Sequence, residues 1–278
     1  MHYIMVFIII VLIVIIIALT LLSFYMYRTA QLDRIIYQDL YFSNLPKHFG
    51  DVRIFFISDV HKRIISDQII AKVQQQVDLV IIGGDLTERT VPFAHVEQNL
   101  AKLKSIGAPL YFVWGNNDYE VDVHELDARL LQYGVTILAN AAVHLEAKQG
   151  EKMTLLGIED ITVERDRLDM ALADAHNVKD AFRILVSHNP KVKVQVQEEH
   201  RISLVLSGHT HGGQVRFLGY GPYKLGDTEM FNNCVYVTSN GYGTSTIPMR
   251  LTAKPETHLF TLKRGHHTSI GEKKEVQF

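Results

Sequence analysis

The chain has 278 residues, which is enough for one large domain or two small ones. Its 28 lysines and arginines nearly balance its 30 aspartates and glutamates, and this balance argues against a nucleic-acid-binding surface that covers the protein. The single cysteine, Cys234, excludes a disulfide framework and a CxxC zinc site.

The first predicted element is an apolar helix at the N-terminus. Residues 1–27 contain no Lys, Arg, Asp or Glu, and residues 4–26 are almost wholly aliphatic. At about 1.5 Å per residue this helix would be roughly 34 Å long, which is enough to cross a bilayer. A cleaved signal peptide is the alternative, but its positive start, shorter apolar core and small-x-small cleavage site are not evident. We therefore predict a transmembrane anchor over residues 1–27.

The residues after the anchor predict the side of the membrane on which the rest of the chain lies. Arg28, Arg34 and Lys47 follow the helix, whereas only the α-amino group precedes it. The positive-inside rule then predicts a single-pass protein of the cell membrane whose catalytic part is cytoplasmic. Residues 28–50 are predicted to be a linker that contains a short strand candidate at Arg34–Leu40.

From residue 52 onward, short apolar runs alternate with helical patterns. Helices are predicted where apolar residues recur at spacings of three and four, within 65–77, 93–103, 123–133 and 168–175. Strands are predicted at 52–58, 79–82, 110–114, 136–138, 143–146, 154–157, 183–186, 203–206, 235–238 and 258–262. This alternation is typical of an α/β domain, and the later strands suggest a second sheet. We predict a four-layer α/β/β/α sandwich over residues 51–263, followed by a polar, mobile tail over 264–278.

Five of the predicted strands end in polar side chains, most of which can bind a metal ion. In chain order these are Asp59 and His61, Asp85, Asn116 with Asn117 and Asp118, His188, and His209 with His211. Ligands of α/β proteins bind beyond the carboxyl ends of the strands, so neighbouring strands would bring these groups to one edge. Within LVLSGHTHGGQ the two histidines are two residues apart, and on an extended backbone such residues point to the same side.

The types of side chain predict the chemistry of this edge. Asp, Asn and His without thiolate suit Mn, Fe or Zn. All of these side chains except Asn117 and Asp118 are candidate ligands. Seven ligands are too many for one zinc and fit two divalent ions. Asp85 is the natural bridge because Gly83 and Gly84 let the backbone come close. Two ions would acidify a water molecule and neutralise charge on a phosphate. Each residue alone could be a turn former, a helix cap or a hydrogen-bonded histidine, but their occurrence at five strand ends favours the metal site.

The ordered motifs DxH, GGD, GNND, a single His and GHTHGGQ resemble those of the calcineurin-like metallophosphoesterase superfamily over about residues 50–262. GHTHGGQ and the later TSNGYGTSTIPMRL resemble a bacterial branch that is often membrane-associated. The resemblance implies a four-layer sandwich with a two-metal centre. It assigns the first metal to Asp59, His61, Asp85 and His211, and the second to Asp85, Asn116, His188 and His209.

The chain departs from the family pattern at Asn117. The family usually has GNHD, whose histidine contacts the phosphate and protonates the leaving group, whereas this chain has GNND. Asparagine can donate a hydrogen bond but cannot deliver a proton at neutral pH. We therefore predict a preference for esters or anhydrides with good leaving groups, and we expect Asp118 to hold Asn117 or a neighbour of a metal ligand. Arg250 in PMRL is either a phosphate contact or part of a structural ion pair.

The first functional hypothesis is a membrane-anchored, metal-dependent phosphoric ester hydrolase with two divalent ions. A metal-bound hydroxide would attack a phosphate ester, diester or pyrophosphate, and Asn117 and Asp118 are the catalytic candidates. The anchor favours a lipid-linked substrate, while a soluble nucleotide stays open. The alternative is a metal-binding scaffold of the same fold with little or no catalysis.

Overall fold

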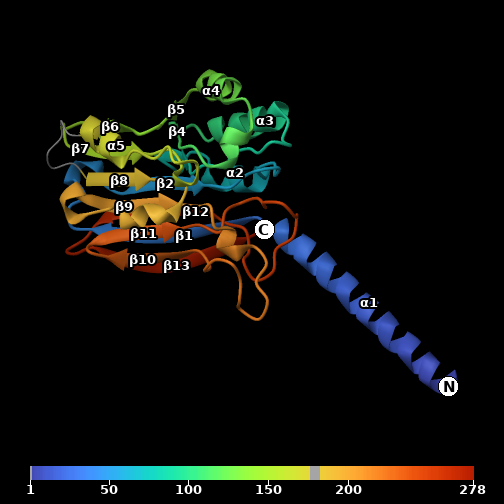
Figure 1. Ribbon diagram of the computed structural model, residues 1–278. Coiled ribbons are helices and arrows are strands. Elements are labelled where there is room, and N and C mark those ends of the chain that lie inside the picture. Colours follow the sequence, from blue (N-terminus) through green and yellow to red (C-terminus); the bar gives the residue numbers. More distant parts are fainter. Residues whose placement is uncertain (1, 176–181) are drawn as a thin grey trace.

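The computed structural model describes residues 2–175 and 182–278, which form two β-sheets with helices around them (Figure 1). The first sheet has the strand order β13 (Ser269–Gln277), β1 (Arg34–Phe42), β12 (Thr257–Arg264), β2 (Val52–Ile57), β3 (Leu79–Ile82), β4 (Leu110–Phe112) and β5 (Val135–Ile137). The second has the order β10 (Asp227–Phe231), β11 (Cys234–Thr238), β9 (Ile202–Ser207), β8 (Phe182–Val186), β7 (Lys152–Gly157) and β6 (Ala141–Glu146). The α-helices are α1 (His2–Ala30), α2 (Asp67–Val73), α3 (Phe93–Lys104), α4 (Val123–Gln132) and α5 (Leu168–Asp174).

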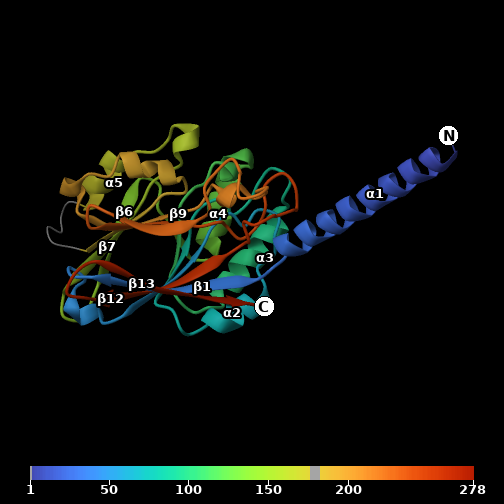
Figure 2. The same ribbon diagram turned by 90° about the horizontal axis from the view of Figure 1, so that it is seen from below.

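Three apolar cores hold these elements together. Adjacent residues of β2 point to opposite faces, so Phe55 packs with α2–α4 whereas Ile54 packs between the two sheets. On the outer face of the second sheet, Leu168 of α5 packs with Leu185 and Val205. Figure 2 shows α5 and α2 on opposite sides of the pair of sheets. The α/β class predicted from the sequence is confirmed.

The predicted linker and the predicted tail are both parts of the first sheet, which corrects two of the boundaries expected from the sequence. Strand β1 lies within residues 28–50 and pairs in parallel with β12, and β13 lies within 264–278 and pairs antiparallel with β1. The sequence of β13 is mostly polar because it is an edge strand with an exposed face. Backbone hydrogen bonds to β1 make β13 part of the fold. Such pairing leaves no pattern of hydrophobic residues in the sequence.

Helix α1 extends away from the sheets (Figure 1). Within the described parts of the chain it is the one helix long and apolar enough to cross a membrane, with a mean hydropathy of 3.7 over its most apolar window. Its end is fixed to the domain, since Thr29 and Ala30 are buried and the backbone N–H of Arg250 donates to the carbonyl of Met26 at 3.0 Å. Residues 1–27 as a transmembrane anchor stay a prediction.

The parallel strands determine where the polar loops meet. In the first sheet β2, β3 and β4 are parallel neighbours, and in the second sheet β7, β8 and β9 are parallel neighbours. Because parallel strands end at the same edge of a sheet, the loops after them converge. These loops carry the polar residues that the sequence places after strand ends.

Candidate metal centre

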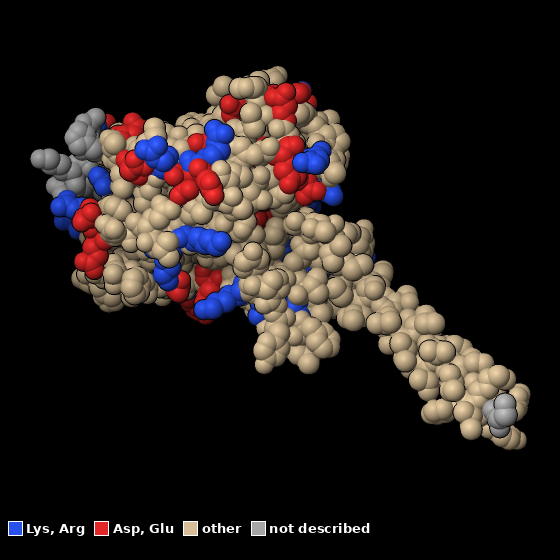
Figure 3. Space-filling model, viewed as in Figure 1, with Lys and Arg blue, Asp and Glu red and all other residues tan. Residues whose placement is uncertain are grey.

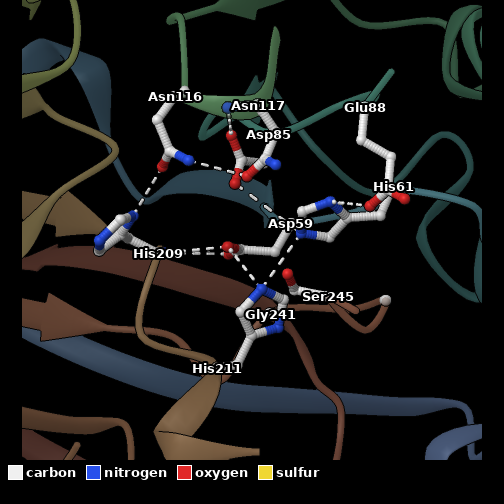
Figure 4. Close-up of polar contacts among 12 residues, drawn as sticks. Asp59, His61, Asp85, Glu88, Asn116, Asn117, His209, His211, Gly241 and Ser245 are labelled. Carbon is white, nitrogen blue, oxygen red and sulfur yellow. Dashed lines mark hydrogen bonds and ion pairs between the residues drawn. The ribbon is translucent and has the colours of Figure 1, made fainter. Parts of the chain in front are cut away.

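The loops that follow β2, β3 and β9 contain several strained backbone positions. Five of the seven predicted metal ligands have a positive φ: Asp59 (54°), His61 (51°), Asp85 (51°), His209 (69°) and His211 (50°). Residues other than glycine avoid this left-handed region, and such strain is typically retained at functional sites. The side chains of these five residues point toward one another (Figure 4).

One group of side chains consists of Asp59, His61 and His211. The Nε2 atoms of the two histidines are 3.1 Å apart, and the Nε2 of His211 is 3.4 Å from Oδ1 of Asp59 (Figure 4). The Nε2 of His61 is also 3.8 Å from Oδ2 of Asp85. All three residues are buried, and their ligand atoms lie within 4.8 Å of one another.

A second group surrounds the other side of Asp85. The Nε2 of His188 is 3.2 Å from Oδ2 of Asp85 and 4.0 Å from Oδ1 of Asp59. The Nδ1 of His209 is 2.9 Å from Oδ1 of Asn116. Asp85 therefore lies between the two groups, as a bridging carboxylate would. The structure brings all seven predicted ligands together.

The contacts of His188 test whether this site fits a cation. Its Nδ1 is 2.8 Å from the carbonyl oxygen of Gly83, which can only accept, so Nδ1 carries a proton. In a neutral imidazole Nε2 then carries a lone pair, which faces the carboxylates of Asp85 and Asp59. The lone pair and the carboxylate oxygens repel each other. Although burial lowers the pKa of His188, the two carboxylates raise it well above its ordinary value. A positive charge between these atoms, from a proton or a metal ion, removes this repulsion, and His, Asp and Asn donors without thiolate suit a divalent ion.

A cavity of about 450 Å³ opens over these residues. Its walls include Asp85, Asn117, His209 and His211 together with segments of the loops 213–223 and 245–247. A substrate phosphate in this cavity would lie directly against both groups of candidate ligands.

Comparison with known proteins adds an independent line of evidence. A family model described as calcineurin-like phosphoesterase matches residues 52–213, which contain every predicted ligand. The chain belongs to this family. It is therefore a metal-dependent phosphoric ester hydrolase, and the resemblance to the calcineurin-like superfamily is confirmed.

Three relatives illustrate the range of the family. YpbG of Bacillus subtilis is 46% identical over 210 residues, which are 75% of this chain and 80% of that protein. The phosphodiesterase YaeI of Escherichia coli is 28% identical over 230 residues, 76% of this chain and 82% of that protein. A transmembrane protein with metallophosphoesterase domain from Danio rerio is 29% identical over 269 residues, 84% of this chain and 58% of that protein.

The two catalytic candidates from the GNND motif have different surroundings in this phosphoesterase. Asn117 lines the cavity, where its backbone N–H donates to Oδ1 of Asp85 at 2.8 Å and its side-chain oxygen accepts from Asn116. Asp118 is fully buried and accepts backbone N–H bonds from Asp85, Thr87 and Gly115 at 2.8, 3.0 and 2.9 Å. Burial and the charge of Asp85 raise the pKa of Asp118 to about 7. Asp118 thus holds the backbone of the loop that carries Asp85, a candidate metal ligand.

Arg250 has a structural role in the loops around the site. Its side chain is fully buried, and its guanidinium donates to the carbonyls of Asn240, Gly243 and Ala253 at 2.7, 2.6 and 2.9 Å. It also contacts Nδ1 of His211 at 3.1 Å. These contacts hold the segment 240–253 against a candidate ligand, so the sequence alternative of a phosphate contact is not supported.

Two carboxylates near the site were missed by the sequence analysis. Glu88 places Oε2 3.1 Å from Nδ1 of His61 and Oε1 2.9 Å from Nζ of Lys62. Asp160 lies beside His188 and His209, and one of its buried oxygens has no hydrogen-bond partner among the residues that the structure describes. Asp160 follows β7 in LLGIED, so the rule applied to the other strand ends would have found it. Glu88 lacks such a signal because it follows Asp85 within a loop.

Glu88→Gln is expected to weaken binding of the ion at His61 by about 10- to 100-fold, because an outer carboxylate orients a ligating histidine and raises its basicity. The close contact with His61, followed by the contact with Lys62, lowers the pKa of Glu88 to about 2, so the wild-type side chain is ionised at neutral pH. Isothermal titration of the metal-free protein with Mn²⁺ measures the change. Glu97→Gln, in a surface ion pair with Arg129, is the matched control. Equal Mn²⁺ affinity in both variants would contradict a positioning role for Glu88.

Proposed function

We propose that this protein is a membrane-anchored phosphoesterase that hydrolyses phosphodiesters or pyrophosphates at a two-metal centre. The observation that carries the proposal is the convergence of seven candidate ligands from five strand ends on either side of one buried carboxylate, Asp85. A single ion could contact only one of the two groups of candidate ligands. It would leave several buried polar side chains of the other group without a partner.

In this proposal Asp59, His61, Asp85 and His211 hold the first ion. The second ion is held by Asp85, Asn116, His188 and His209. Divalent ions at these positions would supply an acidified water as nucleophile and would neutralise charge on the phosphate. The donor set suits Mn, Fe or Zn.

The chain's own residues orient the substrate and limit the leaving group. The side-chain amide of Asn117 lies at the cavity and can donate a hydrogen bond to a phosphate oxygen. It cannot protonate a departing alkoxide, so the reaction favours leaving groups that are stable as anions. Aryl diesters and pyrophosphates have such leaving groups, and lipid-linked diphosphates or nucleotides are the natural compounds of this chemistry.

Removal of metal from the full-length protein in detergent tests the proposal. We expect turnover of bis-p-nitrophenyl phosphate to disappear on chelation and to return with Mn²⁺, Fe²⁺ or Zn²⁺. The rate ratio between the p-nitrophenyl diester and an alkyl diester measures how much the reaction depends on the leaving group. Because Asn117 delivers no proton, we expect this ratio to be larger here than in relatives with GNHD. Two bound ions without any turnover would instead favour the metal-binding scaffold, and a protein that binds no metal would contradict both.

We further propose that α1 spans the cell membrane and that the phosphoesterase domain lies in the cytoplasm. The helix is long and apolar enough to cross a bilayer, and Arg28, Arg34 and Lys47 follow it. A protease added to intact cells is expected to leave a C-terminal tag uncut until the membrane is permeabilised. Digestion of the tag in intact cells would reverse the orientation.

A further inference from the structure

A short hairpin projects from the domain on the side from which α1 leaves (Figure 1). Phe217 and Tyr220 exchange two backbone N–H···O=C bonds, both 2.9 Å long, so that Leu218 and Gly219 form its tip. Residues 216–225 are called the projecting hairpin below. The guanidinium of Arg216 donates to the carbonyls of Gly219 and Tyr223 and braces the turn.

The tip of the projecting hairpin is apolar although it is exposed. Phe217, Leu218 and Tyr220 are 66%, 82% and 84% exposed. Leu218 also has a φ of +49°, a conformation in which Gly, Asn or Asp is favoured in tight hairpin turns. A strained, exposed leucine buries little apolar surface within the chain and so contributes little to folding. Its benefit must come from a surface outside the domain.

The base of the projecting hairpin is connected to the end of α1 through a few rigid contacts. The backbone N–H of Arg216 donates to the carbonyl of Leu251 at 3.0 Å, and the N–H of Arg250 donates to Met26 of α1. Arg63 adds a second connection. Its guanidinium donates to the carbonyl of Gln31 and to Asp33, which follow α1, and to the carbonyl of Tyr242 in the segment 240–253. The hairpin therefore has a fixed position relative to the helix predicted to span the membrane.

The charge of the projecting hairpin fits the surface of a bilayer. It contains Arg216 and Lys224 and no acidic residue. The part of the molecule that projects beside α1 is tan in Figure 3, without the red patches seen on the rest of this face. Tyrosines are enriched at the membrane interface, and basic residues there are attracted by anionic headgroups.

The root of the projecting hairpin is part of the catalytic cavity. Pro222 and Tyr223 line the cavity together with His209 and His211. Whatever surface the tip contacts therefore lies next to the opening through which a substrate phosphate enters.

We propose that the projecting hairpin inserts its apolar tip into the interface of the same bilayer that α1 spans, which places the metal-site cavity at the level of the lipid headgroups. This inference rests on the proposed membrane anchoring by α1. Its consequence is that phosphates carried on membrane amphiphiles reach the site without leaving the bilayer surface.

Depth-dependent quenching in nanodiscs made of phosphatidylcholine and phosphatidylglycerol tests the inference on the full-length protein. Single cysteines carrying an environment-sensitive fluorophore are placed at Leu218, at Ile15 in α1 and at Leu131, an exposed leucine of α4. Burial raises the pKa of the native Cys234 thiol to about 12, so this residue does not compete for the label. We expect lipids with a doxyl group near the headgroup to quench the probe at Leu218 and to leave the probe at Leu131 bright.

Each outcome of this experiment decides a separate point. Quenching at Ile15 but not at Leu218 would overturn the hairpin contact and leave the anchor intact, whereas no quenching at either would overturn both. In the labelled Leu218 protein, Phe217→Ser combined with Tyr220→Ser is expected to reduce quenching while turnover of bis-p-nitrophenyl phosphate is unchanged. Quenching that is unaffected by the double substitution would also overturn the hairpin contact. The soluble diester reports on the phosphoesterase itself, so a failure of the proposed activity is distinguishable from a failure of membrane contact.

Discussion

Asp85→Asn is expected to reduce kcat/KM for bis-p-nitrophenyl phosphate by at least about 10³-fold, which corresponds to about 4 kcal/mol of transition-state stabilisation. The carboxylate of Asp85 lies 3.2 Å from Nε2 of His188 and 3.8 Å from Nε2 of His61, so it serves both groups of candidate ligands. An amide of the same shape keeps an acceptor for the backbone N–H of Asn117 but lacks the charge that bridges two cations. Steady-state kinetics and the metal content of the purified protein measure the effect.

The matched control is Asp78→Asn, immediately before the opposite end of β3. The carboxylate of Asp78 also accepts a backbone N–H bond, from Arg53 at 2.7 Å, but it lies away from the cavity. We expect this variant to retain near-normal turnover and two ions. An Asp85→Asn protein that keeps two ions and more than about one tenth of wild-type activity would remove Asp85 from the bridging role.

Gly84→Ala is expected to lower kcat/KM by about 10²-fold or more without removing any candidate ligand, because a small displacement of a catalytic group is costly. A Cβ at this position would be 2.6 Å from Nδ1 of His188 and 2.8 Å from the backbone nitrogen of Gly115. His188 would have to give up its hydrogen bond to Gly83, which sets the direction of its Nε2 toward Asp85. We expect the protein to lose the ion at His188 first.

Gly107→Ala separates this close approach from backbone strain. Gly84 and Gly107 have φ values of +84° and +87°, but a Cβ on Gly107 would meet nothing within 4 Å. Both substitutions carry a backbone strain cost of about 1 kcal/mol. In Gly107→Ala we expect this cost alone, so the protein should unfold at a slightly lower temperature and remain active. Thermal unfolding and metal content, measured beside kinetics, compare the two. Equal losses of activity would show that strain, and not displacement of His188, is responsible.

Much of the candidate site could be predicted from the sequence because its signals are local. Asp59 and His61 lie within four residues of the end of the buried strand β2, and Asp85 lies three residues after the end of β3. A residue's place just after an apolar run is visible without knowledge of the fold, and parallel strands then bring such residues together. Asp160 obeys the same rule, since it lies three residues after the end of β7.

Other features depend on contacts between segments far apart in the chain. Glu88 contacts His61 because the loops after β2 and β3 lie side by side in the fold. Asp118 proved to be a buried acceptor of three backbone N–H groups, and Arg250 a donor to backbone carbonyls, although both are charged residues near a motif. No periodicity or spacing distinguishes such a buried role from an exposed one.

The sequence by itself determined the α/β class, the apolar N-terminal helix and the set of side chains able to bind metal, because each depends on composition and order within a short segment. Only the tertiary structure decided that β1 and β13 complete the first sheet, that Glu88 contacts His61, and that the projecting hairpin lies beside α1. These arrangements arise from strand pairing and packing across more than 200 residues of chain, as in the pairing of Arg34 with Gln277. Non-local pairing is chosen by the free energy of the whole fold, and a local pattern of residues does not contain it.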